Sequence, residues 1–312
     1  MSENPENPHA HKLGHPITLH TLTPSDLTSP PHAPEDWIAR VYRQELSGVV
    51  LRGALSAAEA AGAAARLSGL DAEAWGSPNR GMRGGELRTI GDAATPCFTA
   101  FTGPTPERYR EGVAGLVGRY AGLLGGALGA DPVARVSGLL SALAGGRPAA
   151  PPAYVTTAGG AGEAQAQAQA QAQTWLPFNL RALDPGTQIY SHHDAHYRLP
   201  VYAGLGEEYS RHTALSWFIT LQRPEAGGVL TLYGLWGSDP NPPMLPTRFV
   251  DTAALERDYL KREVALEAGD LVVFDSGRFV HRVTAVEGQR PRLTLGGFLT
   301  ERLDGGGLGY WS

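Results

Sequence analysis

The sequence predicts a mainly β protein with flanking helices, in which a jelly-roll core follows an α-helical region. From Thr174 onward, short runs of β-branched and aromatic residues alternate with Gly, Pro and Asp, as in an antiparallel sandwich or jelly-roll barrel. Before that point, apolar residues recur at three- and four-residue spacing, the periodicity of amphipathic helices. Hydrophobic residues make up 42% of 312 residues, which suits one large domain with a helical extension.

The first segment, residues 1–35, is rich in Pro, His, Ser and Thr and lacks apolar periodicity. We expect a flexible tail, or one draped over the surface. Its histidines His9, His11, His15 and His20 are interpreted as solvated side chains, in preference to ligands of a weakly bound metal. The start of the chain has no apolar core of the signal-peptide kind.

Residues 36–162 are expected to form a helical region that packs on the core. One helix is predicted to begin after Ser56, because Ser56 and Glu59 have the spacing of a capping box. A second helix is predicted from about Pro106 to Leu128, where one face is apolar. Before the first helix, ELSGVVLRGAL is typical of a short strand.

Residues 163–173 (EAQAQAQAQAQ) form a low-complexity tract. Strict alternation of Ala and Gln has a period of two, which gives no apolar stripe along a helix. The tract is therefore either a solvated helical spacer or a disordered insert, and we assign no chemistry to it.

Residues 174–312 are expected to form the core of a single catalytic domain. The predicted strands are TWLPFNLRAL, QIYSHH, ALSWFITLQ, GGVLTLYGLW, REVALEAG, DLVVFDSG, HRVTAV and RPRLTLGGFL. A longer insertion from Trp236 to Arg262 contains a Pro-rich stretch and a short predicted helix near Thr252–Lys261. Long loops on a β-barrel often cover its mouth.

Composition limits the classes of partner. The formal net charge of −5 argues against a nucleic-acid binder. No stretch approaches the roughly 20 apolar residues that a membrane span needs. Cys97 is the single cysteine, so no intrachain disulfide is possible, which fits a cytoplasmic compartment; we expect its thiol to be buried or neutral. We expect a small-molecule substrate, and the sequence leaves the oligomeric state open.

His192 and Asp194 are the first candidates for metal ligands, with His281 far downstream as the third. Residues two apart on an extended strand face the same side, so His192 and Asp194 are expected to point into the barrel while His193 points away. Two imidazoles and one carboxylate occupy one face of an octahedral Fe(II) and leave the opposite face open. The alternative is a β-barrel with incidental histidines, which the further motifs around His281 disfavour.

An arginine beyond His281 is expected to bind a carboxylate of a 2-oxo acid. Arg290 and Arg292 have the same strand parity, so both are candidates. We favour Arg292, because the Thr294 hydroxyl faces the same way and can donate a further bond to the carboxylate. Arg290 lacks such a partner. A surface salt bridge is the alternative role for either arginine.

The pattern HxD…H…RxT resembles that of the Fe(II)/2-oxoglutarate-dependent oxygenases. Within that group, LSWFITLQRPEAGGVLTLY, GDLVVFDSGRFVHRVTAVEGQRPRLTLGGFL and the terminal GYWS resemble the free-standing aliphatic halogenases of hapalindole-type and welwitindolinone-type alkaloid pathways, over residues 179–312. The resemblance implies a double-stranded β-helix fold, Fe(II) bound by His192 and His281, 2-oxoglutarate anchored by Arg292, and O2 as the second cosubstrate.

Asp194 departs from the pattern of those halogenases, which carry a glycine where the carboxylate would be, so that chloride takes that coordination position. Because Asp194 fills the position here, we predict hydroxylation of an unactivated C–H bond in a small, secondary-metabolite-like molecule, with release of succinate and CO2. Halogenation, or oxidative desaturation or cyclisation, is the alternative within the superfamily. A non-catalytic β-barrel that binds metal and 2-oxoglutarate is the alternative from another class.

Contacts to cosubstrate or substrate are predicted more broadly. Asn179 and Arg181 share one face of the strand before the HxD motif, and Asn179 is a candidate for binding the cosubstrate. Tyr197, Tyr202 and Trp236 lie on predicted loops near the metal strand or the insertion. Packing or loop surface is the alternative role for each of these side chains.

Overall fold

The structure is a computed structural model that describes residues 12–28, 35–71, 73–75, 87–91, 106–153, 174–194, 205–210 and 214–312. The expectations for Cys97, Tyr197, Tyr202 and the tract 163–173 lie outside these residues.

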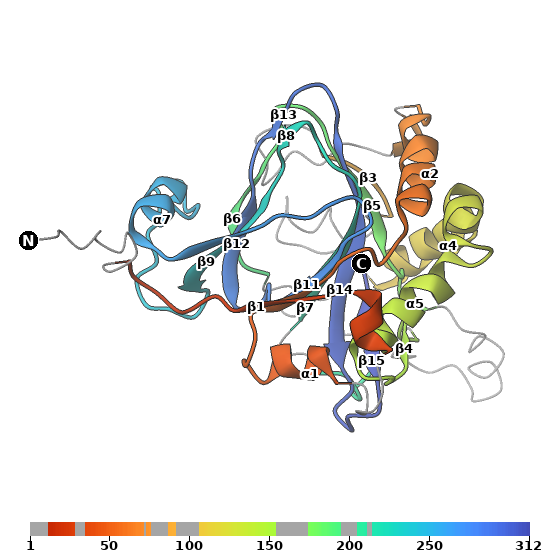
Figure 1. Ribbon diagram of the computed structural model, residues 1–312, viewed down its shortest axis with the longest axis horizontal. Coiled ribbons are helices and arrows are strands. Elements are labelled where there is room, and N and C mark those ends of the chain that lie inside the picture. The colour runs from red at the N-terminus through yellow and green to blue at the C-terminus, as the bar shows by residue number, and fades with distance from the viewer. Residues whose placement is uncertain are drawn as a thin grey trace, which may run out of the picture.

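Two β-sheets face each other (Figure 1). The larger sheet runs in the order β1 (Leu19–Leu22), β2 (Gly48–Leu51), β11 (Leu271–Phe274), β7 (Leu215–Gln222), β14 (Arg292–Glu301), β15 (Leu308–Trp311) and β4 (Ala149–Ala150). β5 (Asn179–Leu183) also pairs with β14, and β3 (Leu87–Ile90) pairs with β5.

The smaller sheet runs in the order β10 (Lys261–Val264), β9 (Leu230–Trp236), β12 (Phe279–Val283) and β6 (Ile189–His192). A short ribbon pairs β8 (Ala226–Gly227) with β13 (Val286–Glu287). Every strand predicted between residues 174 and 312 is present, and the mainly β jelly-roll prediction is confirmed.

Helices cover the outer face of the larger sheet (Figure 1). They are α1 (Trp37–Tyr42), α2 (Ala57–Ser68), α4 (Pro106–Leu128) and α5 (Pro132–Leu143), with 3₁₀ turns η1 (Pro24–Leu27) and η2 (Glu73–Trp75). α2 begins with the predicted capping box: the Ser56 hydroxyl accepts from the Glu59 N–H at 3.2 Å, and the Glu59 carboxylate accepts from the Ser56 N–H at 2.7 Å. No helix in the described ranges is long and apolar enough to cross a membrane.

Apolar side chains join the two sheets in two places. One cluster, the apolar end, comprises Val50, Leu230, Leu232, Val264, Leu266, Val272 and Phe274. The other, the closed edge, comprises Leu87, Leu183, Val283 and Val286. Phe274 of the apolar end contacts His281, with 5.0 Å between ring centroids, and Val283 of the closed edge lies two residues along β12 from His281. The predicted metal ligand therefore lies between the two clusters.

The N-terminal region takes a larger part in the sheet than predicted. β1 pairs in parallel with β2, and His15 stacks on Trp236 with 3.7 Å between ring centroids. The described residues 12–28 therefore contact the body of the protein at these two places. An edge strand shows no apolar periodicity when it buries one side chain, here Leu22. β2 lies within the predicted strand ELSGVVLRGAL, and β3 and β4 also extend the sheet into the region expected to be helical.

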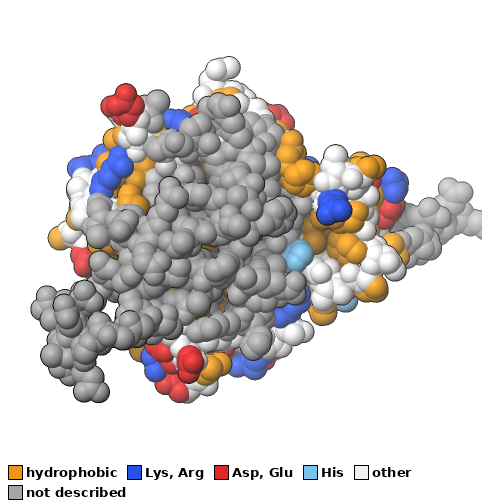
Figure 2. Space-filling model, turned by 180° about the vertical axis from the view of Figure 1, so that it is seen from behind, with side chains coloured by type: hydrophobic (Ala, Val, Ile, Leu, Met, Phe, Trp, Pro, Cys, Tyr) orange, Lys and Arg blue, Asp and Glu red, His pale blue; other side chains and the backbone are white. Residues whose placement is uncertain are grey.

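The insertion between β9 and β10 lies beside β6 and carries α7 (Thr252–Asp258). Phe249 packs against Tyr190 with 5.8 Å between ring centroids, and the Thr252 and Ser191 hydroxyls are 2.8 Å apart. Met244, Leu245 and Phe249 are exposed, and Figure 2 shows hydrophobic side chains gathered on the side of the molecule that carries α7. The insertion therefore contacts the strand that bears His192.

Candidate metal centre and cosubstrate pocket

Three potential ligands converge from β6 and β12. The two strands are antiparallel neighbours, and His192 and His281 are direct partners in the register. Asp194 lies beyond the end of β6, where its N–H donates to the Ser276 carbonyl at 2.8 Å. One ligand atom from each of the three residues lies within 4.8 Å of the others. The Nε2 atoms of His192 and His281 are 3.5 and 3.7 Å from the Asp194 carboxylate oxygens.

Hydrogen bonds to backbone carbonyls orient both imidazoles. The Nδ1 of His192 is 2.7 Å from the Tyr190 carbonyl, and the Nδ1 of His281 is 2.9 Å from the Phe279 carbonyl. A carbonyl is an acceptor, so Nδ1 carries the proton and the Nε2 lone pair is free to bind a metal. Burial, and to a smaller extent His192, lowers the pKa of His281 to about 4, which keeps its ring neutral near pH 7.

The Asp194 carboxylate is buried and is fixed by a side chain of β7, a strand of the larger sheet. It is 5% exposed, and the Ser216 hydroxyl on β7 donates to its Oδ2 at 2.8 Å. Two neutral imidazoles and one anchored carboxylate are the donor set of a non-heme Fe(II) facial triad. The residues present therefore fit a ferrous ion. Ser216 was missed in the sequence, where the available signal is a serine within the otherwise mostly apolar run LSWFITL.

Arg292 is a buried cation at the start of β14. It is 5% exposed, and its guanidinium lies 4.8 Å from the centroid of the Phe218 ring. It has no ion pair among the residues that the structure describes. Burial lowers the pKa of Arg292 to about 10, and neighbouring Arg181 acts in the same direction. An unpaired buried cation is costly, so this position favours an anionic ligand. Buried Thr294 has the same parity on β14.

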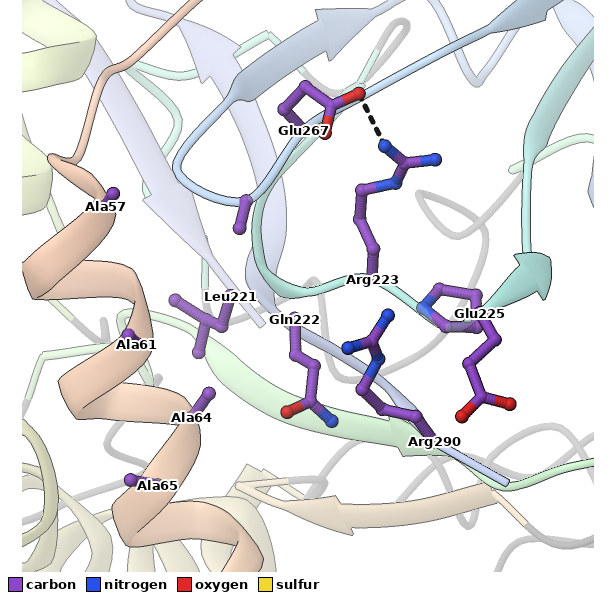
Figure 3. A pocket seen from close by; sticks show the side chains of 12 residues that line it. Ala57, Ala61, Ala64, Ala65, Leu221, Gln222, Arg223, Glu225, Glu267 and Arg290 are labelled. Carbon is purple, nitrogen blue, oxygen red and sulfur yellow. Dashed lines mark hydrogen bonds and ion pairs between the residues drawn. The ribbon is translucent and has the colours of Figure 1, made fainter. Parts of the chain in front are cut away.

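Arg290 lies elsewhere. It is exposed and lines a surface groove of about 580 Å³ between the alanine-rich face of α2 and the turn after β7. Figure 3 shows Arg290 beside Gln222 and Glu225, with the ion pair between Arg223 and Glu267 nearby. None of the three metal-ligand candidates lines this groove. The two candidate arginines are therefore separated, one inside the barrel and one outside it.

The remaining candidates have structural contacts. Asn179 is buried, and its amide donates to the Ser312 hydroxyl at 2.5 Å. Trp236 is enclosed by His15 on one face and by Arg278, 5.3 Å from its ring centroid. Because this bond uses one N–H of the Asn179 amide, a cosubstrate contact would use its second N–H or its amide oxygen.

Comparison with known proteins gives one family match. The model of the family described as carrier-protein-independent halogenase WelO5 matches residues 28–312. No curated protein matches the chain.

Several solved structures are similar at low identity. A Pseudomonas putida prolyl-4-hydroxylase is 17% identical with a TM-score of 0.41, over 85% of this chain and 98% of that one. A Burkholderia ambifaria N-substituted L-amino acid dioxygenase, in complex with α-ketoglutarate, is 16% identical with a TM-score of 0.43, over 88% and 90%. The epimerase SnoN from nogalamycin biosynthesis is 18% identical with a TM-score of 0.40, over 83% and 79%. Similarity at this level decides nothing about the reaction.

The family match covers most of the chain and coincides with the His–Asp–His site. Fe(II) is accordingly the metal of this protein, and 2-oxoglutarate and O2 are its cosubstrates. The chain belongs to the WelO5 family of carrier-protein-independent halogenases, within the Fe(II)/2-oxoglutarate-dependent oxygenases.

Proposed function

We propose that this protein hydroxylates an unactivated C–H bond of a small, secondary-metabolite-like molecule, with conversion of 2-oxoglutarate to succinate and CO2. One observation carries the proposal: the Asp194 carboxylate lies beside the two imidazoles, within reach of the same metal ion, and accepts a hydrogen bond from the Ser216 hydroxyl. With this carboxylate as a ligand, the position that chloride takes in the glycine-bearing halogenases would be filled.

In this account His192, Asp194 and His281 hold the ferrous ion. Their orientation is set before the metal arrives, because backbone carbonyls fix both imidazoles and Ser216 fixes the carboxylate. When bound, the iron supplies the oxidising power that breaks the substrate C–H bond.

Arg292 and Thr294 are proposed to bind the 5-carboxylate of 2-oxoglutarate. The guanidinium offers two parallel N–H donors in a buried space that lacks a competing carboxylate among the described residues. Phe218 lies beneath the guanidinium and Phe274 lies against His281. These rings exclude water from the positions where charge must be held.

Halogenation is the second candidate, because the family described by the matching model is a halogenase family. It requires that Asp194 leave the metal so that a halide can bind. Desaturation or cyclisation requires no change of ligands, and the product separates it from hydroxylation: loss of two hydrogens in place of the gain of one oxygen.

The test combines spectroscopy with product analysis. Anaerobic addition of Fe(II) and 2-oxoglutarate is expected to produce a visible charge-transfer band that is unchanged when chloride replaces bromide in the buffer. Asp194→Gly is the matched variant, and its band is expected to depend on the halide. With O2 and a turned-over substrate, mass spectra are expected to show oxygen and no halogen in the product. A halogenated product from the unaltered protein would refute hydroxylation, and tight 2-oxoglutarate binding without succinate formation would favour a non-catalytic role.

We further propose that residues 36–162 and 174–312 act as one catalytic domain. This rests on β2, β3 and β4, which belong to the same sheet as the core strands.

A further inference from the structure

Arg181 projects into the space between the two sheets. Alternate residues of β5 have different surroundings: Leu180 and Ala182 pack in the main core under the helices, whereas Leu183 packs at the closed edge with Val283 of the smaller sheet. Arg181 has the parity of Leu183. It therefore points inward, toward the side that carries the metal-ligand candidates.

In the pairing of β5 with β14, Arg181 lies one inward-facing residue pair closer to the metal-ligand candidates than Arg292 does. Arg292 is the partner of Leu183, which belongs to the closed edge, whereas Arg181 is the partner of Thr294. On the smaller sheet, Val283 also belongs to the closed edge, and His281 is the next inward residue. Arg181 and His281 are thus each the next inward-facing residue after the closed edge, on opposing sheets.

Arg181 has no counter-charge in the described parts of the chain. Its Nε is buried without a hydrogen-bond partner, and its guanidinium forms no ion pair with any residue that the structure describes. Arg88 on the adjacent strand β3 provides the contrast, because its guanidinium forms hydrogen bonds of 2.8 and 2.6 Å with both Asp184 oxygens. The outward-facing Arg88 therefore has a carboxylate partner, whereas the inward-facing Arg181 and Arg292 have none among the described residues.

A charge count distinguishes the roles of these two inward arginines. The ferrous ion and Arg292 carry positive charges that Asp194 and the two carboxylates of 2-oxoglutarate balance in full. Arg181, which is partly buried, then remains as one positive charge with no partner among the described residues, and this position favours an anionic group beside it.

We propose that Arg181 recognises a carboxylate, or another singly charged anionic group, on the organic substrate. This rests on the proposed function, since the charge count includes iron and 2-oxoglutarate. Bidentate pairing with a planar anion would position the substrate at the height of the metal, and neutral analogues would bind less well.

The test measures binding with catalysis switched off. The protein is loaded anaerobically with Zn(II) and saturated with 2-oxoglutarate. Calorimetry then compares a panel of carboxylates with their primary amides, for example 3-phenylpropionate with 3-phenylpropionamide. We expect at least one carboxylate to bind about tenfold or more tightly than its amide, the magnitude of a charge-assisted hydrogen bond.

Variants assign that preference to one residue. Arg181→Gln is expected to abolish it while changing the dissociation constant of 2-oxoglutarate by less than about threefold, and Arg181→Lys is expected to retain part of it because the charge remains. Arg290→Gln removes the same charge from the exposed groove and is expected to change neither quantity.

Two outcomes would overturn the inference. If no carboxylate in the panel binds better than its amide to the unaltered protein, Arg181 does not select anionic substrates. If Arg181→Gln weakens 2-oxoglutarate as strongly as Arg292→Gln does, Arg181 belongs to the cosubstrate site. The 2-oxoglutarate titration of the unaltered protein is read separately: its failure would refute the proposed function, and the inference would fall with it.

Discussion

The space between the two sheets contains the apolar end and, between it and the closed edge, a polar site, and these two regions have different roles. The apolar end, around Leu232 and Phe274, is filled by side chains that are almost fully buried and touch one another. The polar site holds His192, Asp194 and His281 together with Arg181 and Arg292, two arginines that have no ion pair among the described residues. The first stabilises the fold, whereas the second costs stability until ligands bind. Substitutions in the apolar end should therefore change stability, whereas substitutions in the polar site should change ligand binding.

The largest effect is expected at the polar site, from His281→Ala, or from Asp194→Ala assayed in halide-free buffer so that no halide replaces the carboxylate. Either change removes one of three metal ligands and should reduce succinate formation by about a thousandfold or more, because the remaining protein contributes positioning without metal chemistry. The measurement is the rate of succinate formation with Fe(II) supplied. His20→Ala removes a histidine that stacks on Trp37 outside the site and should leave the rate unchanged. A variant at 194 or 281 with an unaltered rate would exclude that residue from the metal site.

Leu232→Ala tests the apolar end. Leu232 is 0% exposed, so truncation should lower the free energy of unfolding by about 2–5 kcal/mol through lost burial and a residual cavity. The measurement is urea denaturation of the metal-free protein. Leu303→Ala is the control, since Leu303 is 68% exposed and should change stability by less than about 0.5 kcal/mol. Because Leu232 is also the register partner of His281, the deciding quantity is stability: a change as small as that of Leu303→Ala would contradict the role of the apolar end.

Arg292→Gln should show the opposite of Leu232→Ala: weaker 2-oxoglutarate binding without a loss of stability. The dissociation constant of 2-oxoglutarate should rise about thirtyfold, the magnitude of a lost charge-assisted pair. The stability of the ligand-free protein should stay level or increase, because a buried unpaired cation is removed. Calorimetry and thermal unfolding of the same sample give both quantities. Arg290→Gln is the matched control, and equal effects of the two variants would refute the assignment of the cosubstrate anchor.

Ser216→Ala should weaken metal binding by about tenfold, as expected when a residue that orients a metal ligand is lost. The hydroxyl donates to Asp194 at 2.8 Å, and its removal should leave the unfolding midpoint of the metal-free protein nearly unchanged. Competition with a chelator measures the affinity. Ser137→Ala removes a hydroxyl that bonds Tyr310 on the outer side of the sheet and should not alter metal affinity.

The pH dependence of stability gives a further test of the polar site, through His281 and Asp275. Burial lowers the pKa of His281 to about 4, so His281 contributes stability above the ordinary histidine pKa of 6.5 that is lost as the pH falls toward 4. Burial raises the pKa of Asp275 to about 6, so this carboxyl contributes stability at low pH that is lost as the pH rises from 3.8 through 6. The two contributions oppose each other between pH 4 and 6.

Removing the opposing group should expose the histidine contribution. In metal-free Asp275→Asn, the free energy of unfolding should fall more steeply between pH 6 and 4 than in the unaltered protein, by up to about 1.4 kcal/mol per pH unit. Urea midpoints measured with chelator present give the two profiles. Parallel profiles would show that the Asp275 carboxyl does not titrate in this range.

The sequence was a good guide where a signal is local. Strands of the core, the capping box at Ser56 and the HxD motif each depend on residues a few positions apart, and the structure contains all of them. The meeting of His281 with His192 could also be anticipated, because a jelly roll brings distant strands together. Strand parity alone left Arg290 and Arg292 as alternatives, and burial separates them.

Features that depend on long-range register were not predictable. The pairing of β1 with β2, the Ser216 bond to Asp194 and the Asn179 bond to Ser312 each join residues far apart in the chain. None leaves a pattern in the local sequence, since a serine within a strand or an asparagine at the start of one has many possible partners. The assumption that His192 and Asp194 lie on one strand was also incomplete. β6 ends at His192, and the Ser276 carbonyl fixes the backbone of Asp194, two residues beyond.

A crystal structure grown anaerobically with Fe(II), 2-oxoglutarate and bromide tests the central claim most directly. The account predicts an Asp194 oxygen and the Nε2 atoms of His192 and His281 at bonding distance from iron, the 5-carboxylate against Arg292, and no anomalous bromide signal at the metal. Bromide bound to iron, with the Asp194 carboxylate turned away, would contradict it.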